Sequence, residues 1–159
     1  MKQELKERYP APASVVIKMM TDKKFYTDRL EKLGHAKYEV LEHKTDPFSL
    51  KIRRPMPIQV PGVLKKFVPG NPTIVHVDAW NAKTMTGSVL VELPGIPVEI
   101  SATTSLKDQG SESVLTYVFE IRSKVPLLGG TIEKATAAEN EKEIPLQTRA
   151  GIELLKNYR

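Results

Sequence analysis

The segment SVLTYVFEIRSKVPLLGGTIEKATAAENEKEIP, residues 113–145, changes its hydrophobic period near Gly129. In its first part apolar and polar residues mostly alternate, which predicts a strand with one buried face and one solvated face. The apolar face consists of Leu115, Tyr117, Phe119 and Ile121. After Gly130 the apolar residues recur at helical spacing. The segment therefore predicts an antiparallel strand followed by a long C-terminal helix.

This helix is predicted to run from Leu128 to Lys156, about 40 Å at 1.5 Å per residue. Its expected apolar stripe contains Leu128, Ile132, Ala135, Leu146, Ala150 and Leu154, with Ala138 at its edge. Pro145 removes one backbone hydrogen bond, so we expect a kink or a break there. The small residues Ala135 and Ala138 either leave a void between helix and sheet or allow close packing.

Upstream of residue 113, the sequence alternates between strand patterns and turn residues. A weak first strand covers residues 3–9, and two short helices follow at residues 13–20 and 22–33, the second capped by Asp22. Five further strands are predicted at residues 38–45, 49–54, 73–80, 86–93 and 98–107. This order predicts an α+β fold, in which a curved antiparallel sheet of about seven strands wraps around the C-terminal helix.

Composition limits the classes of function. The 159 residues suit one domain spanning residues 1–159, and the absence of cysteine excludes disulfides, thiolate metal sites and cysteine nucleophiles. The net charge of +5 is spread along the chain without interleaved aromatic residues, so we expect no nucleic-acid partner. No apolar stretch approaches the roughly 18 residues of a membrane span. The charged residues 1–8 do not form a secretory signal, so the expected location is the cytoplasm.

Several stretches carry a resemblance to known proteins. Residues 9–22 resemble the opening of the START-like superfamily: a strand, a Pro-Ala-Pro turn, a short helix and a Thr-Asp pair. Lys23 departs from that pattern, because many relatives have proline there. Residues 52–55, 66–68, 80 and 125–134 resemble an uncharacterised domain-of-unknown-function family within the superfamily. The resemblance covers essentially the whole chain and implies a helix-grip fold around a cavity, but no particular activity.

Residues 61–68 form a short amphipathic segment between two predicted strands. Val63, Leu64 and Phe67 can lie on one side of a helical turn, with Lys65 and Lys66 on the other. This pattern fits a loop packed against the core. It fits equally a lid over a cavity mouth, with at most transient contact with a lipid surface.

Arg54 continues the apolar face that Leu50 and Ile52 define in their strand. An inward guanidinium needs a partner, since a buried unpaired charge is costly. Three alternatives remain open: an ion pair with an internal carboxylate such as Glu139, a path to solvent past the strand end, or an anionic group of a ligand.

Other polar residues allow two interpretations each. His76 and Asp78 lie on the same face of a predicted strand, about 7 Å apart. They are either a catalytic base and the group that orients it, or part of a polar sheet face. Glu139 lies within the predicted apolar stripe. It is either a general acid or polar anchor inside the cavity, or a carboxylate that pairs with a basic residue or reaches water through a slight turn of the helix. The three histidines lack the spacing of a metal site, so we expect no metal and no cofactor.

The sequence therefore predicts binding, transport or sensing of a hydrophobic small molecule, such as a lipid or polyketide, in an internal cavity. One alternative is an enzyme of cyclase or hydratase type, which the scarcity of acids and bases on apolar faces disfavours. The other is a protein-interaction module of chaperone-activator type, which predicts a filled core. The residues expected at the cavity lining or mouth are Arg54, Val63, Leu64, Phe67, Trp80, Tyr117, Phe119, Ile132, Ala135 and Glu139.

Overall fold

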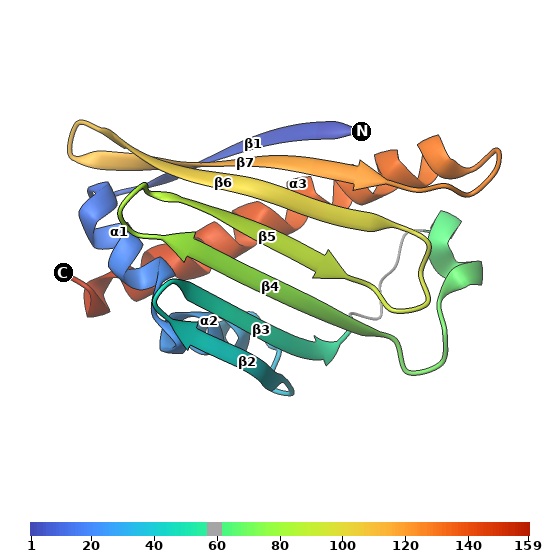
Figure 1. The fold of residues 1–159 in the computed structure, drawn as a ribbon, viewed down its shortest axis with the longest axis horizontal. Coiled ribbons are helices and arrows are strands. Elements are labelled where there is room, and N and C mark those ends of the chain that lie inside the picture. Colours follow the sequence, from blue (N-terminus) through green and yellow to red (C-terminus); the bar gives the residue numbers. More distant parts are fainter. Residues whose placement is uncertain (57–61) are drawn as a thin grey trace.

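The structure, a computed structural model, describes residues 1–56 and 62–159. Its seven strands form one antiparallel sheet in the order β1-β7-β6-β5-β4-β3-β2 (Figure 1). The strands are β1 (Lys2–Tyr9), β2 (Glu39–Thr45), β3 (Phe48–Pro55), β4 (Thr73–Asn81), β5 (Thr86–Glu92), β6 (Glu99–Gln109) and β7 (Glu112–Arg122). The helices are α1 (Ala13–Met20), α2 (Lys23–Lys32) and α3 (Gly129–Leu154), with 3-10 turns η1 (Gly62–Phe67) and η2 (Leu155–Asn157). The predicted α+β helix-grip fold is confirmed.

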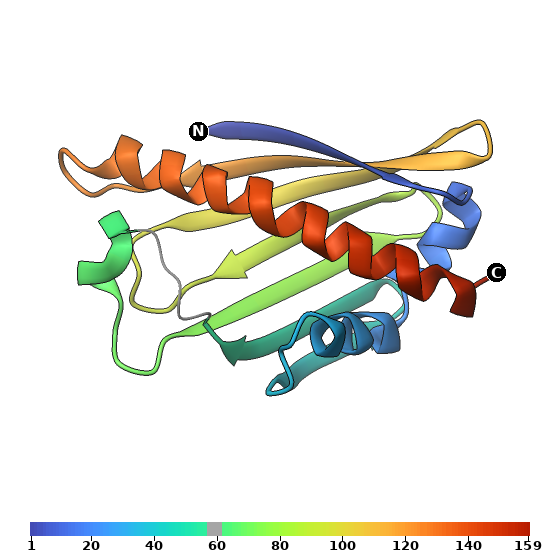
Figure 2. The same ribbon diagram turned by 180° about the vertical axis from the view of Figure 1, so that it is seen from behind.

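One face of the sheet is covered by α3, which crosses it diagonally, while α1 and α2 lie at one end (Figure 2). The four apolar residues of β7 point to this covered face. Leu115, Tyr117, Phe119 and Ile121 are all at most 6% exposed. The alternation in the sequence therefore identified the buried face of the sheet correctly.

The buried face of α3 differs from the predicted stripe. Leu146 is 41% exposed and Ala138 is also exposed, so their predicted inward position was wrong. The buried residues of α3 are Ile132, Thr136, Ala137, Ile144, Thr148, Ala150, Gly151 and Leu154. The helix turns a partly polar side toward the sheet, because the space between them is not filled with apolar side chains. Pro145 is exposed and lies within a continuous helix, so it causes no break.

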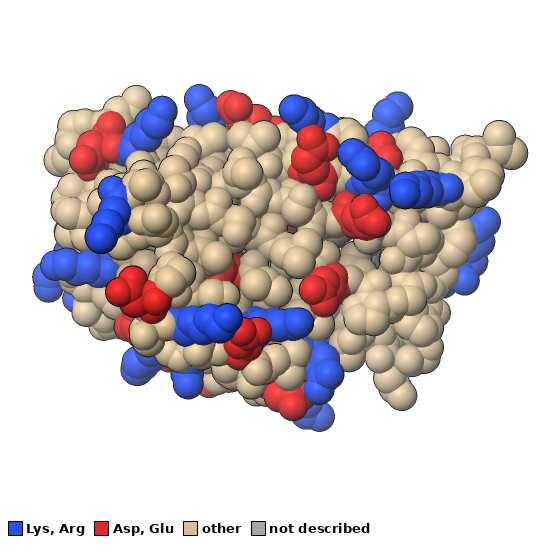
Figure 3. Space-filling model, in the orientation of Figure 1, with Lys and Arg blue, Asp and Glu red and all other residues tan. Residues whose placement is uncertain are grey.

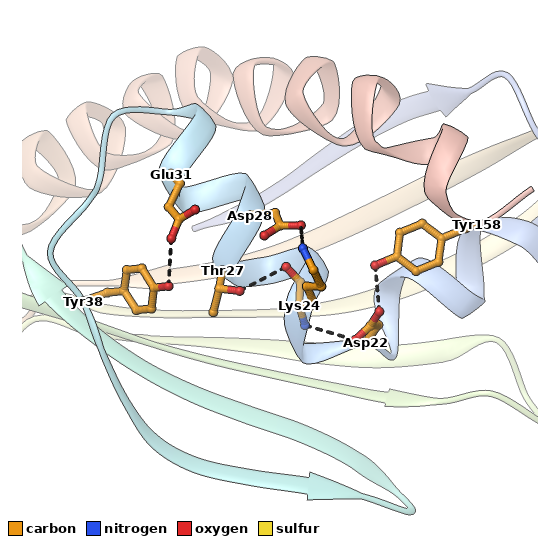
Figure 4. Close-up of polar contacts among 7 residues, drawn as sticks. All are labelled: Asp22, Lys24, Thr27, Asp28, Glu31, Tyr38 and Tyr158. Atoms are coloured by element: carbon orange, nitrogen blue, oxygen red, sulfur yellow. Dashed lines mark hydrogen bonds and ion pairs between the residues drawn. The ribbon is translucent and has the colours of Figure 1, made fainter.

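Hydrogen bonds hold α2 at the end of the sheet (Figure 4). The Asp22 side chain accepts from the backbone N–H of Lys24 at 3.0 Å, which is the predicted N-cap. The same carboxylate accepts from the Tyr158 hydroxyl at 2.8 Å, and Glu31 accepts from the Tyr38 hydroxyl at 3.2 Å. These bonds tie α2 to the C-terminal turn and to the segment before β2, so its inward side chains are fixed.

Further polar contacts fix both sides of α3. On one side, Gln3 of β1 donates from Nε2 to the carbonyl of Ala137 at 2.8 Å and accepts from Asn140 at 3.1 Å. On the other side, Lys32 of α2 pairs with Glu153 at 2.8 Å. The helix is thus attached to β1 and α2, while its middle spans the sheet.

The outer face of the sheet carries mixed charge. Acidic and basic side chains lie together along its margins, and its broad centre is mostly uncharged (Figure 3). Among the described residues on this face, basic side chains lie beside acidic ones and do not gather into a separate patch. Across the described parts of the chain, no helix has the length and apolar character needed to cross a membrane.

Candidate functional site

A cavity of about 250 Å³ lies between the covered face of the sheet and α3. Much of its lining is apolar and comes from β4 to β7 and η1. The apolar residues from these elements are Leu64, Ile74, Trp80, Val89, Val91, Ile100, Leu115 and Phe119, and Leu93 follows directly after β5. This apolar part of the lining favours an apolar guest, since water beside it finds few hydrogen-bond partners.

Gly87 shapes the floor of the cavity at Trp80. The two residues are opposite each other on β5 and β4. A Cβ atom at position 87 would lie 2.8 Å from the Trp80 ring and 2.9 Å from the Thr104 hydroxyl, and still closer to the carbonyl of Ala79. Only glycine lets the indole lie against this part of the sheet.

One part of the cavity lining is polar. It contains Arg29 of α2, Arg54 of β3, His76 and Asp78 of β4, and Glu143 and Gln147 of α3. All six residues also line an adjoining pocket of about 40 Å³, next to Leu30 and Leu33 of α2. Because the pleat places alternate residues of β4 on one face, His76 and Asp78 enter the cavity beside Ile74 and Trp80. We call these six residues the polar side of the cavity.

Arg54 is buried at 7% exposure, and its Nε and Nη1 have no hydrogen-bond partner among the residues described. Burial lowers the pKa of its guanidinium, an effect that Glu143 opposes and Arg29 reinforces. The predicted ion pair with Glu139 is not formed, because Glu139 instead contacts Lys142 at 3.4 Å. The low exposure of Arg54 also leaves little of its side chain open to solvent past the strand end. The carboxylate whose charge acts on Arg54 is instead that of Glu143, one helical turn further along α3.

The two titratable groups of β4 have shifted pKa values. Burial, reinforced by the charges of Arg54 and Arg29, lowers the pKa of His76 to about 3, so the imidazole is neutral at pH 7. Burial raises the pKa of Asp78 to about 6, against the opposing effect of Arg29. The Nε2 atom of His76 is buried without a hydrogen-bond partner in the described structure. A neutral imidazole and two guanidiniums thus share a largely apolar space.

The structure distributes the ten predicted site residues between the cavity and its surroundings. Six line the cavity: Arg54, Leu64, Trp80, Tyr117, Phe119 and Glu139. The other four are not part of the lining: Val63, Phe67, Ile132 and Ala135. Ile132 is fully buried in the core, and Ala135 is half-buried on α3. These two residues pack beside the cavity because α3 presents Thr136 and Glu139 to it instead.

The predicted lid segment forms η1 over part of its length. Leu64 is 3% exposed and reaches the cavity, while Val63 and Phe67 are half-buried beside it. Lys65 and Lys66 are exposed on the other side, as the amphipathic pattern predicts. The start of the predicted segment at residue 61 lies outside the described residues.

Sequence reasoning missed part of the polar side. Arg29 and, apart from Glu139, the polar residues of α3 were not predicted to enter a cavity. The α3 residues are Thr136, Asn140, Glu143 and Gln147, which recur at helical spacing. This spacing indicates a polar face of the helix. The prediction instead followed the apolar residues of the same helix and placed another face toward the sheet.

Comparison with known proteins gives the family. Residues 4–153 match the family described as "Protein of unknown function (DUF2505)". The chain belongs to this family. No curated protein matches the sequence. The DUF2505 match agrees with the predicted resemblance to an uncharacterised family, and the structural relatives share the predicted fold.

Three solved structures illustrate the fold similarity. TTHA0849 from Thermus thermophilus is 12% identical with a TM-score of 0.68, over 99% of this chain and 98% of that one. The Zhui aromatase/cyclase from Streptomyces sp. R1128 is 14% identical with a TM-score of 0.66, over 98% and 93%. Norcoclaurine synthase from Thalictrum flavum is 12% identical with a TM-score of 0.66, over 98% and 86%. At such identities the similarity concerns the fold alone.

Proposed function

We propose that this DUF2505 protein binds a hydrophobic small molecule in the cavity between the sheet and α3, as a carrier or sensor. The observation that carries this proposal is the cavity of about 250 Å³ with its apolar lining from β4 to β7. Burial of apolar ligand surface there is favourable at about 25 cal/mol per Å² before the costs of association. Relatives of the same fold include an aromatase/cyclase and a synthase, which also supports a role for the cavity.

The test is a titration with N-phenyl-1-naphthylamine, an uncharged fluorophore that brightens in apolar surroundings. We expect saturable binding by the wild-type protein and a raised melting temperature, because the ligand stabilises only the folded state. Val91→Trp should abolish binding, since Val91 lines the cavity and the indole fills part of it. Leu90→Trp is the matched control, because Leu90 is the adjacent residue of β5 and is 43% exposed. Equal binding by both variants, or none by the wild type, would contradict the proposal.

The second candidate is an enzyme that uses the same cavity. Asp78 favours it, because a carboxyl with a pKa of about 6 can accept and return a proton near neutral pH. The corresponding reaction class is proton abstraction next to a carbonyl of the bound molecule. The test is protein-dependent exchange of deuterium into 2-decanone. Exchange that is lost in Asp78→Asn would support the enzyme. Exchange that the substitution leaves unchanged would exclude Asp78 as the group that moves the proton.

The interaction-module alternative predicts a filled core. The volume between sheet and α3 therefore weighs against it. We accordingly place ligand binding first and the enzyme second.

A further inference from the structure

We infer that the polar side of the cavity binds the singly charged anionic head group, such as a carboxylate, of an otherwise apolar ligand, and that Arg54 makes the direct contact. This inference rests on the proposed function, because it assigns chemistry to the ligand of the same cavity. It goes beyond that function by naming a class of molecule and the residue that recognises it.

The first argument is the state of Arg54. The side chain is 7% exposed, lines the cavity and leaves Nε and Nη1 without a partner in the described structure. A guanidinium remains charged when buried, so it needs an anion or strong acceptors to offset its lost hydration. The edge formed by Nε and Nη2 presents two parallel donors, and neither atom has a hydrogen bond in the described structure. Such an edge matches the two oxygens of a carboxylate.

The second argument concerns the internal carboxylates, none of which forms an ion pair with Arg54 in the described parts of the chain. Arg54 is opposite Ile74, whereas Leu50 is opposite Asp78. Arg54 and Asp78 are therefore four residues apart along the strands, about 13 Å. Glu143 extends from an exposed position of α3. The space in front of the guanidinium thus belongs to the cavity.

The third argument is the balance of charge on the polar side. Arg29 is the cation that lowers the pKa of Asp78, and it also lies over the ring of Phe25, with 4.9 Å between guanidinium and centroid. Arg29 therefore already has a carboxylate and an aromatic face near it. For Arg54, the opposing charge among the described residues is that of the exposed Glu143. One buried positive charge remains uncompensated, which fits a ligand with one negative charge.

The neutral imidazole of His76 completes this arrangement. Its Nε2 is buried without a partner among the described residues, and it lies on the same sheet face two residue pairs along from Arg54 and Ile74. It can hydrogen-bond a head group without adding charge. The apolar lining from β5 to β7 then receives the rest of the molecule.

The test compares decanoate with decan-1-ol, which share a chain and differ in the head group. Each displaces N-phenyl-1-naphthylamine from the wild type and from Arg54→Met at neutral pH. We expect the wild type to bind decanoate about tenfold or more tightly than the alcohol, as for hydrogen bonds to a charged group. Arg54→Met should lose this preference and keep its affinity for the alcohol within about twofold.

Arg53→Met is the matched control. Arg53 is the neighbouring residue of β3, its side chain is 46% exposed, and it pairs with Glu39. It should retain the wild-type preference. Acetate should not displace the fluorophore, which would show that the site needs the apolar chain as well as the anion. Decyl phosphate should bind less tightly than decanoate. A phosphate bound more tightly than the carboxylate would overturn the single-charge assignment.

The outcomes separate the inference from the proposed function. If the wild type binds acid and alcohol equally, or if Arg54→Met loses both equally, the inference is wrong while ligand binding stands. If neither compound nor the fluorophore binds, the proposed function itself fails. Should Arg54→Met not fold, Arg54→Lys carries the test, because it keeps the charge without the planar fork. It should reduce the preference for the acid, and an undiminished preference would overturn the role of the fork.

Discussion

His76 and Asp78 make opposite contributions to the pH dependence of stability. Because burial lowers the pKa of His76 from 6.5 to about 3, the unfolded chain takes up this proton first as the pH falls. The folded state therefore loses stability through His76 between about pH 6.5 and pH 3. Burial raises the pKa of Asp78 from 3.8 to about 6, so here the folded chain takes up the proton first. Asp78 thus adds stability as the pH falls through 6 toward 4.

The two shifts set the expected magnitudes. Between pH 8 and pH 5, the shift of His76 lowers the free energy of unfolding by roughly 2 kcal/mol, and the shift of Asp78 raises it by roughly 1 kcal/mol. Between these pH values, Asp78→Asn should therefore lose roughly 1 kcal/mol more free energy of unfolding than the wild type. His76→Gln should lose roughly 2 kcal/mol less than the wild type.

Urea unfolding at the two pH values measures these changes. The fluorescence of Trp80 reports on unfolding, because it is the only tryptophan in the sequence and is 5% exposed in the fold. His43→Gln is the control, since His43 is exposed on β2. If the wild type and both variants showed the same pH dependence, His76 and Asp78 would not have shifted pKa values. The account of the polar side would then be refuted.

Two further predictions concern Arg54 and η1. Arg54→Met should raise the free energy of unfolding of the ligand-free protein by about 1–3 kcal/mol in urea unfolding, because it removes a buried charge with unpaired donors; a loss of that size would show that Arg54 stabilises the fold. Replacing Lys65 and Lys66 with glutamate should weaken flotation with anionic liposomes at low salt, because each basic residue near such a surface contributes about 1 kcal/mol. The same exchange at Lys83 and Lys107, which are exposed on other elements, is the control, and equal flotation of the two double variants would exclude membrane contact through η1.

The sheet could be predicted because its signals are local. Alternation at Leu115, Tyr117 and Phe119 identifies a buried face from neighbouring residues alone. The inward direction of Arg54 followed in the same way from its parity with Leu50. These inferences need no knowledge of what lies across the core.

The cavity lining from α3 could not be predicted in this way. A hydrophobic stripe identifies the buried side of a helix only when the opposing space is filled. Here the space is a cavity, so Thr136 and Gln147 face inward while Leu146 faces solvent. That Arg54 has no partner among the described residues likewise depends on the orientation of α3 and on strand register, which are tertiary features. The contribution of Arg29 depends on how α2 docks.

The central claim is that the cavity holds an apolar molecule with one anionic group. Native mass spectrometry of the protein purified from its own host tests this most directly. The account predicts one small molecule bound per chain, identified after release as an amphipathic carboxylate, and its absence from Val91→Trp prepared in parallel. Protein of bare mass that also fails to bind N-phenyl-1-naphthylamine would contradict the account.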